Sequence, residues 1–85
     1  MSQVEIYTKI GCVFCLRAKF LLWRMKVKYQ EIDVTSDTDK YAEMQSRSKR
    51  HTVPQIFIDS QHIGGSDDLV AAKRTGKLKE LLKAH

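Results

Sequence analysis

Two cysteines, Cys12 and Cys15, are the residues of this sequence whose type and spacing most directly suggest chemistry. They stand three positions apart in the stretch KIGCVFCLRAK, and the 85 residues contain no other cysteine. Such a pair can supply half of a zinc site, form a structural disulfide, ligate a metal cluster or act as a redox-active dithiol. The rest of the sequence distinguishes among these four alternatives.

A zinc site and a structural disulfide are both disfavoured. Structural zinc takes four ligands, and beyond the cysteines the candidates are three histidines without the paired spacing of a zinc signature, His51, His62 and His85. We expect these histidines to be ordinary surface or core residues, and we expect no bound metal. A disulfide would add little in the cytoplasm, where this chain is expected, because that compartment keeps thiols reduced.

The position of the cysteine pair favours a redox-active dithiol. A strand is expected to end just before Gly11, and a helix is expected to start at about Cys12. The Cys12 sulfur then lies near the free backbone N–H groups and the positive end of the helix dipole. Cys15 lies one turn further along, on the same face and within reach for a disulfide. We therefore predict that Cys12 is the exposed nucleophile and Cys15 the shielded, resolving thiol.

The hydrophobic pattern predicts a small α/β fold that positions these cysteines. Short β-branched and aromatic stretches such as VEIYT and QIFID are typical of strands, and longer stretches with apolar residues at helical spacing separate them. The expected elements are strand 4–8, helix 12–25, strand 27–34, helix 35–48, strand 55–59, a turn at 60–61, strand 62–65, helix 66–76 and helix 77–85. This order favours two parallel strands and an antiparallel hairpin, with helices on both faces of the sheet.

Composition predicts one soluble domain spanning residues 1–85, without linkers or repeats. The hydrophobic content is 42% and the charged content 29%. No run approaches the ~18 apolar residues of a membrane span, and the N-terminus lacks a signal-peptide pattern, so no membrane partner is expected. The net charge of +5 raises the question of nucleic-acid binding. Acidic residues interrupt the basic ones, however, and RSKRH is the nearest approach to a basic run, so no nucleic-acid partner is expected.

Two further segments could complete a binding site. Pro54 is the sole proline; it either starts a strand or sits in a cis bond that turns the Val53 backbone outward to pair with an extended peptide. The stretch GGSDD predicts a tight turn into a helix capped by Ser66 or Asp67. The free N–H groups there suit a carboxylate, and the Asp67 carboxylate suits an ammonium group. A ligand with both groups and a thiol between them is a glutathione-like tripeptide.

These pieces, in this order and spacing, resemble the glutaredoxins over essentially the full chain. The matching stretches are VEIYTK, GCVFC, TVPQIFID, and HIGG followed by SDDL. The resemblance, to small bacterial dithiol glutaredoxins, implies a thioredoxin-like fold with a four-stranded mixed sheet and a cis proline at Pro54. It also implies that glutathione binds along eight residues: Lys9, Phe14, Thr52, Val53, Pro54, Gly65, Ser66 and Asp67.

The resemblance further implies a function and the roles of particular residues. The chain is expected to be a monomeric glutathione-dependent thiol–disulfide oxidoreductase that acts on glutathionylated and disulfide-containing proteins, with glutathione as co-substrate and no permanent cofactor. Cys12 would take the glutathionyl group and a second glutathione would release it, while Cys15 would resolve protein disulfides. Lys9 would meet the glycyl carboxylate of glutathione, Val53 its cysteinyl backbone, and Ser66 and Asp67 its γ-glutamyl end.

The sequence departs from the family pattern at three positions. Val13 and Phe14 stand where the commonest motif carries proline and tyrosine, and Tyr41 stands where many relatives carry arginine or glutamine. One carboxylate contact is then missing, or is moved to one of three nearby basic residues, Arg47, Lys49 or Arg50.

The change at Val13 sustains an alternative function. Relatives that lack the proline can bind a [2Fe–2S] cluster between two subunits, held by Cys12 of each subunit and by two glutathione thiolates. Four thiolates are the usual requirement of such a cluster. Cluster binding or delivery as a dimer, or a redox-sensing role, therefore stands beside the oxidoreductase hypothesis.

Overall fold

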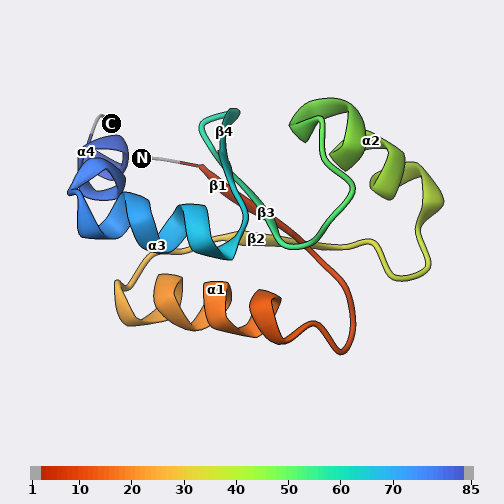
Figure 1. Cartoon of the computed structure of the whole chain (residues 1–85), viewed down its shortest axis with the longest axis horizontal. Coiled ribbons are helices and arrows are strands. Elements are labelled where there is room, and N and C mark those ends of the chain that lie inside the picture. The colour runs from red at the N-terminus through yellow and green to blue at the C-terminus, as the bar shows by residue number, and fades with distance from the viewer. Residues whose placement is uncertain (1–2, 84–85) are drawn as a thin grey trace.

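The computed structural model describes residues 3–83, which form a four-stranded sheet and four helices (Figure 1). No helix in this range is long and apolar enough to cross a membrane. The elements in chain order are β1 (Val4–Thr8), α1 (Val13–Arg24), β2 (Gln30–Asp33), α2 (Thr38–Ser48), β3 (Gln55–Ile58), β4 (Gln61–Gly64), α3 (Ser66–Arg74) and α4 (Lys77–Lys83).

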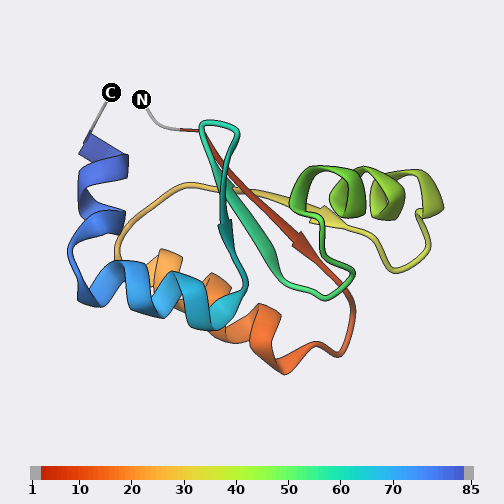
Figure 2. The same cartoon turned by 45° about the horizontal axis from the view of Figure 1, so that its top comes forward.

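The strands lie in the order β2-β1-β3-β4. β1 pairs with β2 in parallel and with β3 in antiparallel register, so that Ile6 lies opposite Ile56. β3 and β4 form an antiparallel hairpin. The predicted mixed sheet of two parallel strands and a hairpin is thus confirmed, as are helices on both of its faces (Figures 1 and 2).

The two central strands are buried on both faces and hold two apolar cores. Alternate residues of β1 and β3 point to opposite faces, as the pleat of a strand requires. On one face, α1, α3 and α4 cover the cluster Val4, Ile6, Ala18, Leu22, Ile56, Ile58, Leu69, Ala72 and Leu78. On the other face, α2 alone covers the smaller cluster Tyr7, Val34, Met44 and Phe57. α1 and α3 therefore lie side by side on the same face (Figures 1 and 2).

A polar network ties α2 to the sheet on the smaller side. The Arg47 guanidinium lies 4.0 Å from the centre of the Phe57 ring. The same group donates hydrogen bonds to Glu5 Oε1 at 3.0 Å and to the Tyr7 hydroxyl at 2.7 Å, while that hydroxyl donates to Glu43. Charge-assisted bonds in a part-buried setting are stronger than surface ion pairs, so Arg47 is a structural residue of this interface.

Strand β2 is shorter than predicted, because the chain remains tied to α1 after that helix ends. The backbone N–H of Val27 donates to the carbonyl of Leu22 at 3.0 Å, and Lys26 adopts a left-handed conformation with φ of 58°. Pairing with β1 begins only at Gln30. The alternating pattern from residue 27 onward therefore predicts the start of this strand three residues too early.

The hairpin turn and the start of α2 are also displaced from the prediction. Asp59 and Ser60 have φ of 50° and 68°, the combination of a two-residue hairpin turn, so the turn lies one residue earlier than expected and β4 begins at Gln61. α2 begins at Thr38 instead of residue 35, because the Asp37 carboxylate caps it by accepting the Lys40 N–H at 3.0 Å.

The N-terminus of α3 is capped differently from the prediction that Ser66 or Asp67 would cap it. Gly65 is the N-cap residue, and its N–H donates to Asp68 Oδ2 at 2.9 Å. The preceding residue, Gly64, has φ of +125°, and a Cβ atom built there would lie 2.3 Å from that same oxygen. This turn thus requires glycine at position 64 for two reasons, backbone conformation and space.

Gly64→Ala is expected to lower the free energy of unfolding by about 2–4 kcal/mol, because it adds backbone strain and displaces the Asp68 cap. Urea unfolding followed by circular dichroism measures the change. Gly76→Ala is the matched control: its φ is +83°, but nothing lies within 4 Å of the added Cβ, so a loss of only about 1 kcal/mol is expected. Equal losses for both variants would show that the contact with Asp68 is unimportant.

Candidate active site

The sulfur of Cys12 occupies the N-cap position of α1. With φ of −88° and ψ of 108°, Cys12 turns its side chain back over the first helical turn, where Sγ accepts the Cys15 N–H at 3.1 Å. This role usually belongs to a serine, threonine, aspartate or asparagine oxygen. The Cys12 thiol also points to the Val53 carbonyl oxygen at 3.8 Å, and its side chain is partly exposed. The helix therefore begins where the sequence predicts and presents one accessible sulfur.

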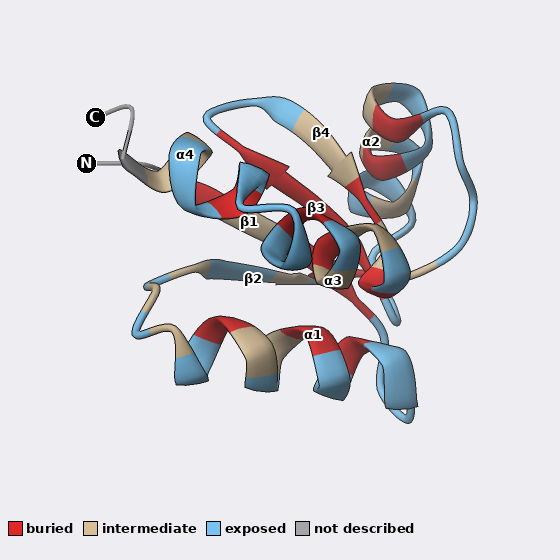
Figure 3. Cartoon of the chain, turned by 60° about the vertical axis from the view of Figure 1, so that its left-hand side comes forward, coloured by how far each residue is buried: buried red, intermediate tan, exposed pale blue. Residues whose placement is uncertain are grey.

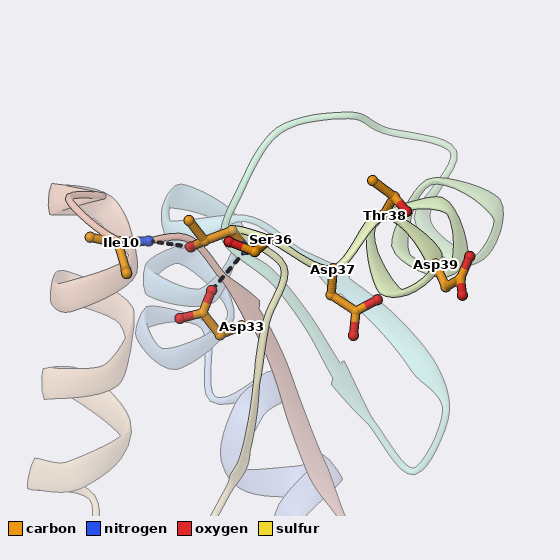
Figure 4. Close-up of a pocket in the computed structure, with 7 residues that line it drawn as sticks. Ile10, Asp33, Ser36, Asp37, Thr38 and Asp39 are labelled. Atoms are coloured by element: carbon orange, nitrogen blue, oxygen red, sulfur yellow. Dashed lines mark hydrogen bonds between the residues drawn. The ribbon is translucent and has the colours of Figure 1, made fainter.

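The loop that carries Cys12 is anchored to the segment between β2 and α2 (Figure 4). The Ile10 N–H donates to Thr35 Oγ1 at 2.9 Å, and the Thr35 N–H donates to Asp33 Oδ1 at 2.8 Å. Hydrogen bonding from the Thr35 side chain and from its N–H lowers the pKa of Asp33. The cavity drawn in Figure 4, of about 530 Å³, has no cysteine among its lining residues, so it contributes to the site only through this anchor.

Cys15 lies in the core, with 1% of its surface exposed. Burial, followed by the hydrogen bond with Cys12, raises the pKa of Cys15 to about 12. Cys15 is therefore a neutral thiol at pH 7. The structure thus places the two sulfurs as predicted, one accessible and one shielded.

A cavity of about 300 Å³ lies on the α1–β2 side of the cysteines, and Lys9, Cys12 and Cys15 are among its lining residues. Inside it, Glu31 accepts hydrogen bonds from Lys19 Nζ at 2.9 Å and from Thr8 Oγ1 at 2.7 Å. The bond from Lys19 is the main reason that the pKa of Glu31 is lowered. Both charges of this pair are compensated, so the cavity carries no unbalanced charge from them.

A second cavity beside the cysteines, which we call the groove, has a volume of about 220 Å³. It brings together seven of the eight residues predicted to bind glutathione, and adds two others. Its lining residues are Phe14, Arg50, Thr52, Val53, Pro54, Gly65, Ser66, Asp67 and Asp68. The eighth predicted residue, Lys9, lines the neighbouring cavity instead, and its Nζ lies 4.5 Å from the centre of the Tyr41 ring.

The floor of the groove contains a cis peptide bond between Val53 and Pro54, which confirms the conformation implied by the resemblance. The Val53 carbonyl faces the Cys12 sulfur. The preceding carbonyl, of Thr52, accepts a hydrogen bond from Gln55 Nε2 at 3.0 Å. The backbone of this segment is thus held next to the accessible sulfur.

The wall of the groove is the N-terminus of α3. Ser66 Oγ is buried and has no hydrogen-bond partner among residues 3–83, which is costly for a polar group unless a ligand or water satisfies it. The Asp67 carboxylate is 90% exposed and lies 3.5 Å from Arg17 Nη1, a separation at which a surface ion pair contributes little. Asp67 is therefore available to a ligand.

Arg50 and Asp68 complete the wall. Arg50 Nη1 donates to Asp68 Oδ2 at 2.9 Å, and this bond is the main cause of the lowered pKa of Asp68.

Of the three basic residues predicted to replace the cation missing at Tyr41, only Arg50 lines the groove. Arg47 is held in the α2 interface, and Lys49 is the exposed C-cap residue of that helix. Sequence reasoning missed Asp68, although its position three residues after a helix N-cap is a capping-box signal.

Two of the three histidines have the ordinary environments that were expected of all three. His62 Nε2 lies 2.8 Å from Gln55 Oε1, and burial lowers the pKa of His62. His51 is exposed, and His85 lies outside the described residues. Within residues 3–83 no group of three or more histidine, cysteine, aspartate or glutamate side chains is arranged to hold a metal ion.

Comparison with known proteins gives one consistent family. The family model described as glutaredoxin matches residues 4–63. The chain is 54% identical over 83 residues to glutaredoxin 3 of Escherichia coli (strain K12), covering 98% of this chain and all of that protein.

Solved structures agree with the sequence comparison. The solution structure of glutaredoxin from Brucella melitensis superposes with a TM-score of 0.84 at 53% identity, covering 95% of this chain and 88% of that one. The buckwheat glutaredoxin–glutathione complex gives a TM-score of 0.86 at 31% identity, covering 95% of this chain and 76% of that one. The thioredoxin-like fold is thereby confirmed.

The difference between the two cysteines predicts selective alkylation. At about pH 7, iodoacetamide is expected to modify Cys12 once and to leave Cys15 unmodified, because Cys15 is buried and its raised pKa of about 12 keeps it a thiol. Peptide mapping by mass spectrometry identifies the modified residue. The Cys12→Ser variant should remain unmodified under the same conditions, and modification of Cys15 before Cys12 would reverse the assignment.

Proposed function

This chain belongs to the glutaredoxin family, and from that premise we propose that it is a glutathione-dependent thiol–disulfide oxidoreductase with Cys12 as nucleophile and Cys15 as resolving thiol. The observation that carries the proposal is the sulfur of Cys12, partly exposed at a helix N-terminus, bonded to the Cys15 N–H, and adjacent to the groove. Both the Cys15 N–H and the first turn of α1 face that sulfur.

The proposed reaction with a glutathionylated substrate has two displacement steps. The Cys12 thiolate attacks the glutathionyl sulfur, a Cys12–glutathione disulfide forms, and the substrate leaves as a thiolate that takes up a proton. The thiolate of a second glutathione then attacks the same glutathionyl sulfur, which releases glutathione disulfide and restores the Cys12 thiolate. In sum, one glutathionylated substrate and one glutathione give the reduced substrate and glutathione disulfide, so the incoming glutathione is the reductant.

Protein disulfides require the second cysteine. Cys12 attacks one sulfur of the disulfide, and Cys15 then loses its proton and attacks the Cys12 sulfur, so that a Cys12–Cys15 disulfide forms and the reduced substrate departs. Two glutathione molecules reduce that disulfide. The raised pKa of Cys15 suits this order, because a neutral buried thiol does not compete with Cys12 for the first attack.

The groove supplies the groups that a glutathionyl moiety needs. The Val53 backbone lies beside the reactive sulfur, where it can pair with the cysteinyl unit of the tripeptide. Ser66 Oγ and the N-terminal N–H groups of α3 suit the γ-glutamyl carboxylate, and Asp67 suits its ammonium group. For the glycyl carboxylate the chain offers the cations of Lys9 and Arg50, one from each cavity. The buckwheat relative was solved in complex with glutathione.

The proposal includes a cellular location, binding partners and an oligomeric state. A cytoplasmic location suits two thiols that must be kept reduced between turnovers. The partners are glutathione and glutathionylated or disulfide-containing proteins, and the chain acts as a monomer, because one chain supplies both sulfurs and the whole groove.

The cluster-binding alternative stays a prediction. Cys15 is buried, so one chain contributes a single accessible thiolate, Cys12, which does not meet the four-thiolate requirement of a [2Fe–2S] cluster. The arrangement therefore needs a second chain and two glutathione molecules. The visible absorption spectrum of protein purified without air in the presence of glutathione distinguishes the two functions.

Substitution of each cysteine separates their roles. Cys12→Ser is expected to abolish turnover of a small glutathione mixed disulfide, because a hydroxyl neither ionises near pH 7 nor forms a disulfide. Cys15→Ser should retain that turnover and lose the reduction of protein disulfides. Glutathione-coupled assays on both substrates measure this. If Cys15→Ser were as inactive as Cys12→Ser on the small substrate, the one-cysteine route would be wrong.

Asp67→Ala is expected to raise the KM for glutathione roughly 3–10-fold with a smaller change in kcat, because it removes one partly solvated charge contact. Asp39→Ala is the matched control. Asp39 is also an exposed carboxylate in the first turn of a helix, but it lies on α2 and outside the groove. Equal KM values for the two variants would place the glutamyl end of glutathione elsewhere.

A further inference from the structure

The outer side of α1 carries an apolar stripe that faces solvent. Val13, Leu16, Phe20 and Trp23 are exposed by 72%, 61%, 57% and 69%. Their spacing of three, four and three residues places them along one side of the helix, which we call the α1 outer face. The opposite side of α1 is buried against the sheet (Figure 3).

The stripe is concentrated, not scattered. All the large apolar side chains that are exposed in residues 3–82 lie between Ile10 and Trp23. The rings of Phe20 and Trp23 stack, with centres 5.8 Å apart and planes inclined by 28°, so they form one continuous surface. Single exposed apolar residues are normal, but a contiguous group on a small domain indicates a contact surface.

The same segment carries the whole positive charge excess of the protein. Residues 9–28 contain six basic residues and no acidic one, whereas the other 65 residues contain nine basic and ten acidic residues. Arg24 flanks the stripe directly, with its guanidinium 5.9 Å from the centre of the Phe20 ring. Lys26 and Lys28 follow at the same end, and both are exposed. Lys19 and Arg17 are paired within the chain, with Glu31 and Asp67. The α1 outer face is therefore an apolar surface with exposed basic residues at its Trp23 end.

We propose that the α1 outer face docks an acidic, apolar segment of the protein substrates whose disulfides Cys12 attacks. This inference rests on the proposed oxidoreductase function. The stripe starts at Val13, next to the nucleophile, and runs roughly 15 Å to Trp23 at the rise of an α-helix. A substrate segment of about ten residues lying along it would keep a flanking cysteine at the Cys12 sulfur.

Docking on this face leaves the groove open. None of the four residues of the α1 outer face lines the groove, whose α1 residue is Phe14; Leu16 lines the neighbouring cavity that also contains Lys9. The groove is otherwise built from residues 50–54 and the start of α3. A protein substrate on α1 and a glutathionyl group in the groove can thus be held at the same time.

Charge favours this occupant over the other candidates. A second copy of the chain would bring two positively charged segments together, and like charges across an interface oppose association. An anionic lipid surface would match the charge, but it offers no disulfide to the sulfur beside which the stripe begins. An acidic protein segment satisfies both the charge and the chemistry.

The test uses a synthetic helical peptide of about 14 residues with leucines on one side, glutamates on the flanks and one terminal cysteine linked to glutathione by a disulfide. Its control carries lysines in place of the glutamates. The wild-type protein is expected to show a kcat/KM for the acidic peptide at least ~10-fold above that for the lysine peptide. Equal values for the two peptides would overturn the proposal.

Two sets of variants locate the effect on α1. The Phe20→Ser/Trp23→Ser variant should lose most of the preference for the acidic peptide while its turnover of the glutathione–2-mercaptoethanol mixed disulfide stays unchanged. The Arg24→Gln/Lys28→Gln variant should lose it in part, whereas Arg74→Gln/Lys79→Gln, which removes two exposed charges from the C-terminal part of the chain, should not. A preference that survives the first two variants would show that the contact lies elsewhere.

A binding measurement distinguishes an acidic protein segment from the two other candidates for this surface, a lipid membrane and a second copy of the chain. Trp23 is the sole tryptophan, so its emission reports directly on the α1 outer face. A blue shift with the acidic peptide, made with serine in place of cysteine, is expected. A shift only with phosphatidylglycerol vesicles, or only on raising the protein concentration with a dimer in sedimentation, would overturn the proposal. Absent turnover of the small mixed disulfide by wild-type protein would instead refute the oxidoreductase function itself.

Discussion

The hydrogen bond from the Cys15 N–H to the Cys12 sulfur is the interaction on which the site depends. It begins α1 and at the same time supplies a donor to the reactive atom, so the helix and the nucleophile form together. The other contacts keep this geometry in place. Thr35 holds the preceding loop through Ile10, and the core holds Cys15, whose own burial fixes the position of the donating N–H.

The groove brings together two helix N-termini on one face of the sheet. α1 contributes Phe14, with its N-cap residue Cys12 beside the groove, and α3 contributes the residues from Ser66 to Asp68. Helix N-termini attract negative charge through their free N–H groups and their dipoles, so the N-terminus of α3 suits a ligand carboxylate. The Asp68 carboxylate caps this second terminus by accepting the Gly65 N–H, and the first N–H groups of a helix have no partner within it.

Local patterns predicted much of the fold and of the site, and long-range contacts account for what was missed. The start of α1 followed from the cysteine spacing, and the mixed sheet followed from the order of strands and helices. The first residue of β2 could not be predicted, because the Val27 N–H bonds to the Leu22 carbonyl and an alternating sequence pattern does not reveal that bond. The location of Arg47 depends on which side of α2 packs on Phe57, a tertiary contact that residues 47–50 do not encode locally.

Because Cys12 caps α1 and is also a redox-active thiol, the folding equilibrium and the dithiol–disulfide equilibrium form one thermodynamic cycle. The sulfur that caps the first turn of α1 is also the sulfur that would enter a disulfide with Cys15, so the start of this helix is coupled to the redox state of the two cysteines. The free energy by which the folded chain favours its dithiol form, relative to an unfolded dithiol, must equal the extra folding stability of that form. For a two-electron couple, about 1.4 kcal/mol of such stability corresponds to a potential about 30 mV more oxidising. The tendency of this protein to accept electrons is thus partly a property of how well one helix begins.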